Sequence, residues 1–363
     1  MHASPFFYNG DVKHWDVVVV GGGVIGLSLS IALRKKGATV LVVERGEPGH
    51  EASHAAGGML VDCPVETPAP LQALATASAA MYPEFVHELQ LESGLPIDLR
   101  DCGTIVFPAP GKAHEWAGIQ RLSFEEQNPV EAAIAPTDRP AFLLKERSVE
   151  PRGLMAALTK SAKHRGVDIS SGDTVTGLTL TQGVVAEVTT NKTSFACQKV
   201  VNCAGAWAGQ IGPVNFPTRP AKGQMLAVVP QARNLLAHVI RSPEAYVIPR
   251  SDGRIVIGTT LEEAGFDKRT DAAVIQRLYR SAVAWVPELA QARILEDWAG
   301  LRPATPDGLP ILGETGIPNY FVATGHYRDG ILLAPVTAAA MAEVINGSPP
   351  AFDLTAFSPA RFA

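Results

Sequence analysis

Cysteine is scarce in this sequence of 363 residues. The four cysteines form no C-x-x-C pair and have no histidine at ligand spacing, which argues against a zinc site and against a disulfide scaffold. We therefore expect no metal site. We expect buried apolar thiols in a reducing compartment, and so a cytoplasmic location.

An excess of positive charge and long apolar runs are also missing. Lys plus Arg number 31 against 36 Asp plus Glu, so the net charge of −5 provides no basic field for nucleic acid or anionic lipid. No stretch reaches the roughly 18 apolar residues that cross a membrane. Residues 1–15 lack a basic segment followed by an apolar core, so we interpret them as an N-terminal extension and not a secretory signal. The composition favours a soluble enzyme that acts on a small molecule.

The first ordered segment predicts one βαβ unit. Residues 16–20 and 39–43 are β-branched runs typical of strands buried on both faces, and 24–36 predicts a helix between them. The turn before the helix, 21–26, reads GGGVIG and fits G-x-G-x-x-G. Because it follows a strand and opens a helix, the motif is informative.

The glycine motif predicts a dinucleotide site. Gly21 permits a tight turn, Gly23 lets the backbone approach a pyrophosphate, and Gly26 lets helix and strand pack closely. The helix start offers N–H groups to phosphate. Glu44, eighteen residues after Gly26, can accept hydrogen bonds from ribose hydroxyls and would repel a 2′-phosphate, which disfavours NADP. The motif leaves NAD and FAD both open.

Two segments of small residues favour FAD. Residues 52–60 (ASHAAGGML) and 201–209 (VNCAGAWAG) would let a long cofactor lie close to the backbone, and Ser53 can hydrogen-bond phosphate. An NAD dehydrogenase does not need these segments, whereas an extended FAD does.

Strands of two kinds alternate along the rest of the chain. Buried runs of parallel type recur near 167, 200 and 320, and alternating patterns of antiparallel type fill 175–190 and 221–260. This order predicts an α/β fold, with a discontinuous Rossmann-like FAD-binding domain and an inserted substrate-binding domain with a mainly antiparallel sheet. The predicted FAD-binding domain comprises 16–60, 149–212 and 297–350, and the substrate-binding domain comprises 61–148 and 213–296. Helices are expected over 71–93, 149–165, 270–286 and 331–345, and a strand pair over 97–107.

Seven segments together resemble the D-amino-acid oxidase superfamily, and within it the glycine oxidases of thiamine biosynthesis. They extend from about 16 to about 345 and read DVVVVGGGVIGLSLSIALRKKG, ASHAAGGML, VNCAGAWAG, PAKGQML, YVIPRSDGRIVIGTT, WAGLRPATPDGLPILG and GHYRDGILLAPVTA. The resemblance implies FAD and the oxidative deamination of glycine, another small amino acid or an N-substituted glycine. Hydride would pass to flavin N5, giving an imine product, and O2 would be reduced to hydrogen peroxide.

The resemblance also implies the residues of the site. Arg302 would bind the substrate carboxylate as a bidentate pair, Tyr246 would assist it, and Arg328 would lie near substrate and flavin. The helix start after Asp329 would present N–H groups to the flavin pyrimidine edge. The implied cofactor-binding set is Gly21, Gly23, Val24, Ile25, Gly26, Glu44, Arg45, Ser53, Ala56, Gly58, Met59, Val175, Ala204, Gly205, Trp207, Gly300, Arg328, Gly330, Ile331 and Leu332.

Two positions depart from the glycine oxidase pattern. Glu244 stands where that pattern has a histidine near the substrate, and Leu261 where a methionine is expected. If both lie at the mouth of the pocket, Glu244 would favour a cationic or extended amine.

Lys222 would either lie near the flavin or be a solvated turn lysine. No side chain is required as a general base, because hydride can leave a neutral amine directly; only His326 among the histidines sits within a motif.

Other functions stay open at this point. Within the family, a D-amino-acid dehydrogenase with a non-oxygen acceptor, or an oxidase specialised for an N-substituted glycine, would carry the same motifs. Outside it, a nucleotide-binding regulatory protein would leave Arg302 and Tyr246 without a common purpose, and an NAD dehydrogenase is disfavoured by the C-terminal half. The expected partners are an amino-acid substrate and O2, and a homo-oligomer is one open assembly state.

Overall fold

The computed structural model describes residues 14–362 except 124, 125, 128 and 129. The predicted extension therefore lies outside the described residues, apart from His14 and Trp15, which already belong to the first strand. The helices are α1 (Val24–Lys35), α2 (Ala52–Ala55), α3 (Gln72–Ser93), α5 (Pro151–His164), α6 (Ala272–Trp285) and α7 (Gly330–Ile345). The strands are β1 (His14–Val20), β2 (Val40–Glu44), β3 (Met59–Leu60), β4 (Leu99–Arg100), β5 (Thr104–Val106), β6 (Arg121–Leu122), β7 (Ala141–Leu144), β8 (Arg147–Val149), β9 (Asp168–Ser171), β10 (Val175–Thr181), β11 (Val184–Thr190), β12 (Ser194–Asn202), β13 (Arg219–Val229), β14 (Val239–Arg241), β15 (Tyr246–Pro249), β16 (Ile255–Gly258), β17 (Arg293–Ala304), β18 (Ile311–Glu314) and β19 (Tyr320–Thr324).

The first sheet has a parallel centre in the order β9-β2-β1-β12-β19. In this register Val19 lies opposite Val42 on one side and Val201 on the other, so segments far apart in sequence meet side by side. The antiparallel strands β10, β11 and β18 extend the sheet beyond this centre. The predicted βαβ unit is present as β1-α1-β2.

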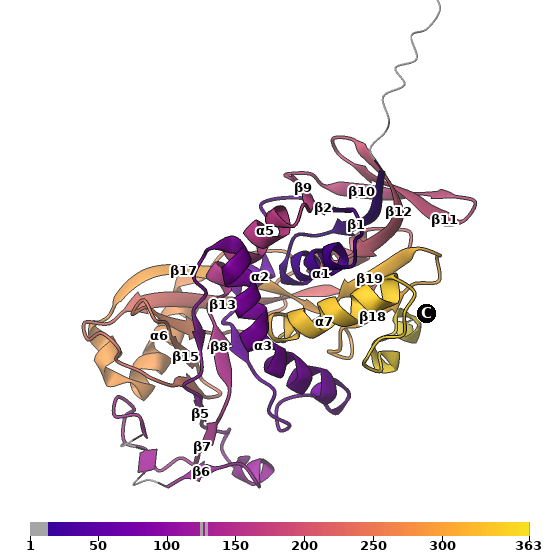
Figure 1. Ribbon diagram of the computed structural model, residues 1–363. Coiled ribbons are helices and arrows are strands. Elements are labelled where there is room, and N and C mark those ends of the chain that lie inside the picture. Colours follow the sequence, from indigo (N-terminus) through magenta and orange to yellow (C-terminus); the bar gives the residue numbers. More distant parts are fainter. Residues whose placement is uncertain (1–13, 124–125, 128–129, 363) are drawn as a thin grey trace, which may run out of the picture.

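The two faces of β1 enter different hydrophobic cores. Val17 and Val19 pack with residues of α1, α3, α5 and α7, which cover one face of the sheet (Figure 1). Val18 and Val20 face a second cluster that includes Phe216. Burial on both faces explains why this strand is an uninterrupted β-branched run.

The second sheet lies beside the first, in the order β17-β13-β16-β15-β14-β5-β7-β6 (Figure 1). Every neighbouring pair in it is antiparallel except β14 and β5. Helix α6 packs on β13 and β16. A three-stranded sheet, β3-β8-β4, completes the described sheets. The predicted α/β fold, with a parallel Rossmann-like sheet and a mainly antiparallel one, is confirmed.

One local prediction was wrong, and one strand was missed. The segment 97–107 does not form a strand pair with itself, because β4 pairs with β8 whereas β5 pairs with β7 and β14. The long strand β17 was not predicted, and it pairs along its whole length with β13 in the second sheet. Its residues cross the predicted boundary at 296 and 297; the domain boundaries remain predictions.

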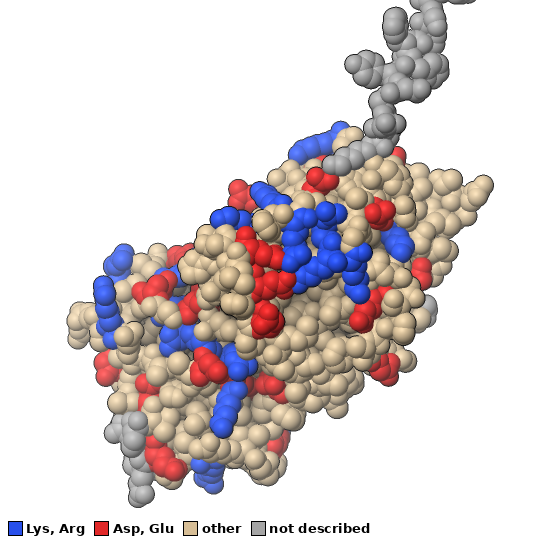
Figure 2. Space-filling view, viewed as in Figure 1, with Lys and Arg blue, Asp and Glu red and all other residues tan. Residues whose placement is uncertain are grey.

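The surface carries charges of both signs. Figure 2 shows Lys and Arg side chains interspersed with Asp and Glu on the viewed face, without one broad basic field. Lys35 pairs with Glu88, and Arg165 pairs with both Glu88 and Glu92. No helix among the described residues is long and apolar enough to cross a membrane. All four cysteines are free; three are buried as expected, but Cys102 is exposed.

Candidate active site

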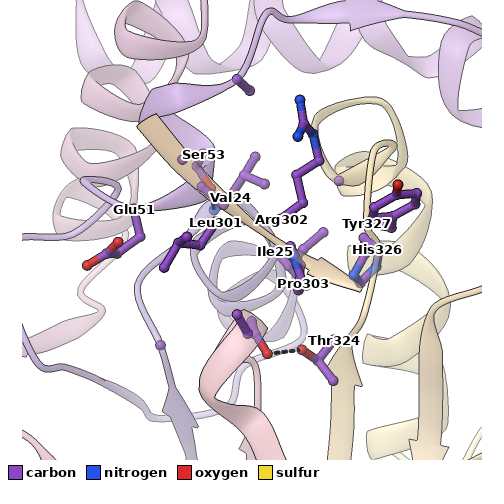
Figure 3. A pocket seen from close by; sticks show the side chains of 18 of the residues that line it. Val24, Ile25, Glu51, Ser53, Leu301, Arg302, Pro303, Thr324, His326 and Tyr327 are labelled. Atoms are coloured by element: carbon purple, nitrogen blue, oxygen red, sulfur yellow. Dashed lines mark hydrogen bonds between the residues drawn. The ribbon is translucent and has the colours of Figure 1, made fainter. Parts of the chain in front are cut away.

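A cavity of about 680 Å³ extends from the carboxyl ends of β1 and β2 to the facing strands β13 and β17. The carboxyl ends of parallel strands are where α/β folds bind ligands, and this volume suits a large cofactor together with a small substrate. Figure 3 shows Arg302 and Tyr327 on one side of the cavity and Glu51 and Ser53 on the other.

The glycine turn brings bare backbone to the cavity wall. Gly21 has φ +106°, and a Cβ there would lie 2.6 Å from the Cys203 carbonyl oxygen. A Cβ at Gly26 would lie 2.0 Å from the Gly21 carbonyl oxygen. The strand, turn and helix can therefore approach this closely only with glycine at both positions. This glycine cradle, residues 21–26, fits a dinucleotide pyrophosphate, which needs close backbone N–H groups and no side chain between them and the phosphates.

Two polar side chains fix the ends of this cradle. Glu44 is buried at the end of β2, where its Oε2 accepts from the Gly22 N–H at 2.8 Å and its Oε1 from the Gly46 N–H at 2.9 Å. Ser53 Oγ accepts from the Val24 N–H at 3.0 Å, at the start of α1. The Glu44 carboxylate is thus held rigidly at the cavity wall, where ribose hydroxyls would meet it.

An aromatic and ionic cluster encloses the same end of the cavity. The Arg45 guanidinium lies 3.5 Å from the ring centroid of Trp207, and Trp207 packs against Phe266 with centroids 5.0 Å apart. Arg45 also pairs with Glu51, which in turn accepts from Lys268 at 3.0 Å. Phe266 and Lys268 follow β16, so a loop of the second sheet covers a site built on the first.

Most of the predicted cofactor residues line this cavity. They are Gly21, Gly23, Val24, Ile25, Glu44, Arg45, Ser53, Ala56, Gly58, Met59, Val175, Ala204, Gly205, Trp207, Gly300, Arg328, Gly330 and Ile331. Gly26 and Leu332 do not line it. Gly26 lies one turn into α1 beneath the Gly21 carbonyl, and the Leu332 side chain points into the core with an exposed fraction of 1%.

Arg302 enters the cavity from β17, where it is half-buried. Its Nη2 donates to Thr259 Oγ1 at 2.8 Å and its Nη1 to the Thr260 carbonyl at 3.2 Å. Among the described residues it has no acidic partner within ion-pair distance, and burial lowers the pKa of its guanidinium. Burying a cation without a counter-ion is costly, so the arrangement suits a ligand that supplies the negative charge.

Tyr246 and Arg328 meet at the same end of the cavity. Arg328 Nη2 donates to the Tyr246 hydroxyl at 3.1 Å, although the two residues come from β15 and from the turn before α7. Both line the cavity together with Arg302. The three side chains predicted for substrate binding are therefore brought to one place by three separate segments.

Three further charged residues line this end and were not predicted. Arg241, at the end of β14, is buried and pairs with Glu146 at 2.8 Å and with Glu66. Glu66 and Asp329 also line the cavity, and burial raises the pKa of the Asp329 carboxyl to about 6. Only Asp329 lies in a motif that could have drawn attention to it; Glu66 and Arg241 stand in segments without a distinguishing pattern.

The expected position of Glu244 and Leu261 was wrong. Glu244 pairs with Arg139 at 3.1 Å on the surface and lines a separate, small hollow beside Trp285. The Leu261 residue is 63% exposed. Neither lines the cavity, because the turn 242–245 directs the Glu244 side chain away from the neighbouring Tyr246. A substrate preference therefore has no basis in either residue.

His326 and Lys222 are both buried. His326 lines the cavity, its Nε2 lies 3.1 Å from Thr337 Oγ1, and burial lowers its pKa to about 3, so it is neutral at neutral pH. Lys222 is not a solvated turn lysine: it lies in β13 and its Nζ donates to the Arg269 carbonyl at 2.5 Å. It does not line the cavity.

A family model described as FAD dependent oxidoreductase, DAO, matches residues 16–344. The chain belongs to the DAO family. Among its relatives, the glycine oxidase of Geobacillus kaustophilus is 33% identical, over 96% of this chain and 97% of the relative. The crystal structure titled glycine oxidase from Geobacillus kaustophilus has a TM-score of 0.92, with 32% identity, 96% of this chain and 99% of that chain covered. The predicted resemblance to glycine oxidases is confirmed.

A second group of relatives is longer than this DAO family protein. The bifunctional protein ThiO/ThiG of Trichormus variabilis is 37% identical over 91% of this chain, but the chain spans only 52% of it. The chain thus covers about half the length of these bifunctional relatives. Family membership and the glycine cradle agree on the cofactor, which is FAD, as predicted.

Proposed function

We propose that this protein oxidises glycine, another small amino acid or an N-substituted glycine. The observation that carries the proposal is Arg302, a half-buried guanidinium that lines the cavity without an acidic partner among the described residues. A substrate carboxylate would supply the missing charge in bidentate geometry. The relatives named glycine oxidase support the choice of substrate class.

The side chains around Arg302 would orient the substrate. Tyr246 and Arg328, which are hydrogen-bonded to each other, would hold the other side of the carboxylate, and the Thr259 hydroxyl accepts a hydrogen bond from the guanidinium. Holding the carboxylate determines where the substrate Cα and nitrogen lie, so much of the catalysis is positioning. His326 is neutral and bonded to Thr337, and the proposal requires no proton transfer to it.

The reaction balances as a two-electron oxidation. FAD, when bound, would supply a two-electron acceptor, so that a substrate held by its carboxylate could lose hydride from Cα and leave an iminium in place of the C–N single bond. Hydrolysis of the imine would give a 2-oxo acid together with ammonia, or together with an amine when the substrate is N-substituted. Transfer of two electrons and two protons to O2 gives hydrogen peroxide.

A substrate panel tests this proposal. Purified holoenzyme is given glycine, sarcosine, larger N-alkyl glycines and D-amino acids, and peroxide is measured with O2 as sole acceptor. We expect peroxide with at least one small substrate that carries a carboxylate, and none with the matched amine that lacks it. If D-amino acids reduce a dye but O2 yields no peroxide, the protein is the alternative D-amino-acid dehydrogenase. If no amine is oxidised with either acceptor, the proposal fails.

Further expectations also belong to this proposal. The thiazole branch of thiamine synthesis is the pathway implied by the resemblance. A cytoplasmic location, the absence of a nucleic-acid partner and a homo-oligomeric state stay predictions.

A further inference from the structure

Helix α7 begins at the cavity, and a proline interrupts its second turn. Gly330 and Ile331 line the cavity, while Pro335 lies inside the helix four residues after Ile331. Proline has no N–H, so the Ile331 carbonyl has no partner at the position that normally closes the helical turn. An unpaired buried carbonyl is costly, and loss of this bond loosens the end of the helix that faces the cavity.

Helix α3 supplies the missing donor. The Tyr82 hydroxyl donates to the Ile331 carbonyl at 2.6 Å. One turn earlier on α3, Ser78 Oγ donates to the Leu332 carbonyl at 2.6 Å and accepts from the Val336 N–H at 3.3 Å. Both side chains are fully buried. Ser78 thus stands between the two backbone groups of the next helical bond, and Tyr82 replaces the donor that Pro335 lacks.

We propose that Tyr82 and Ser78 are positioning residues that hold the first turn of α7 against the pyrimidine edge of the flavin. This inference rests on the proposed function for the placement of the flavin. The first N–H groups of a helix and its dipole stabilise negative charge, which develops at flavin N1 and the C2 carbonyl on reduction. Tyr82 and Ser78 act only through the backbone, because neither side chain lines the cavity.

The test compares holoenzyme variants by the properties of the flavin itself. Sulfite adds to flavin N5 and leaves negative charge at N1, so its affinity reports the stabilisation of that charge without any amine substrate. We expect Tyr82→Phe and Ser78→Ala each to weaken sulfite binding about two- to tenfold, the equivalent of one net hydrogen bond, and to make the two-electron potential more negative. Should Tyr82→Phe not fold, Ser78→Ala carries the same test.

A matched control separates positioning from simple loss of stability. The Tyr279 hydroxyl donates to the Leu289 carbonyl, also at 2.6 Å, on α6 and away from the cavity. Tyr279→Phe should lower the free energy of unfolding but leave sulfite affinity and potential as in wild type. If Tyr82→Phe behaves like Tyr279→Phe in all three measurements, the proposal is overturned.

A second-site variant sharpens the test. Pro335→Ala restores an N–H that can bond the Ile331 carbonyl, so in this background Tyr82→Phe should have a much smaller effect on sulfite affinity. Equal effects of Tyr82→Phe with Pro335 and with alanine at that position would contradict the mechanism. Failure of the proposed function would look different: no amine would be oxidised, while the sulfite and potential differences would persist.

Discussion

At the residue scale, the proposed binding of a carboxylate would offset the free-energy cost of burying the Arg302 guanidinium without an acidic partner. This guanidinium is half-buried and held by two neutral oxygen acceptors, from Thr259 and Thr260. Neutral acceptors orient a guanidinium without neutralising it, so the charge stays available to a ligand. Gly223 on the neighbouring strand makes room for it, since a Cβ there would lie 2.3 Å from Arg302 Nη1.

Gly223→Ala should therefore displace the guanidinium without removing it. We expect kcat/KM for the preferred amino acid to fall about 10- to 100-fold, because an ångström-scale displacement of a positioning group has effects of that size. Flavin content should stay as in wild type. Gly177→Ala in β10, where a Cβ would meet nothing within 4 Å, is the control. Wild-type kcat/KM in Gly223→Ala would show that Arg302 is not positioned through this contact.

Asp329 predicts a pH dependence of stability. Burial raises the pKa of its carboxyl from 3.8 to about 6. The folded protein therefore keeps the proton more tightly than the unfolded chain, and the associated stability is present below about pH 4 and lost as the pH rises through 6. Asp329→Asn should thus gain unfolding free energy over wild type between pH 4 and 7, measured by urea unfolding at both values. An equal difference at the two pH values would contradict this assignment.

The sequence predicts some residues of the site and misses others. Arg302, Tyr246 and Arg328 lie in motifs, and the structure brings them together. Glu66 and Arg241 were missed because their roles depend on packing between distant segments, which no local pattern encodes. The position of Glu244 was predicted wrongly for the same reason. Tyr246, two residues later, lines the cavity. Strand alternation alone does not determine the direction of a side chain in the turn before the strand.

At the scale of elements, the loop after β16 links the second sheet to the FAD-binding half. Phe266 packs on Trp207, whose other contact is the Arg45 guanidinium. Phe266→Ala should weaken the binding free energy of FAD by about 0.5–1.5 kcal/mol, the strength of an aromatic pair, and leave KM for the amino acid unchanged. Phe195→Ala, which removes an aromatic contact with Trp15 elsewhere on the first sheet, should not change FAD affinity. An FAD affinity equal to wild type in both variants would exclude a role for the loop.

Element prediction succeeded where burial leaves a simple pattern. Strands β1 and β2 are buried on both faces and read as β-branched runs, and α7 is apolar on nearly every side. Strand β17 has no such pattern. The adjacent Glu296 and Asp297 place a charged side chain on each face of the strand, and Gly300 interrupts the run of side chains. Its conformation comes from pairing with β13, a tertiary effect that propensity does not reveal.

At the scale of the whole molecule, the cavity joins two sheets whose strands are distant in sequence. A ligand that contacts β1, β2, β13 and β17 together binds only the folded chain, and so stabilises it by linkage. FAD at 100 times its Kd should raise the free energy of unfolding of the apoprotein by about 2.7 kcal/mol. NAD at the same concentration is the control and should give little change. Equal stabilisation by NAD would contradict the cofactor assignment.

The central claim is that Arg302 binds a substrate carboxylate beside the flavin. The most direct measurement is kcat/KM of flavin-loaded Arg302→Met with the preferred amino acid, alongside Arg139→Met, which alters a surface arginine paired with Glu244. We expect Arg302→Met to lose about 2–5 kcal/mol in kcat/KM, chiefly through a raised KM, with the flavin spectrum retained and Arg139→Met unaffected. A kcat/KM in Arg302→Met within twofold of wild type would contradict the account.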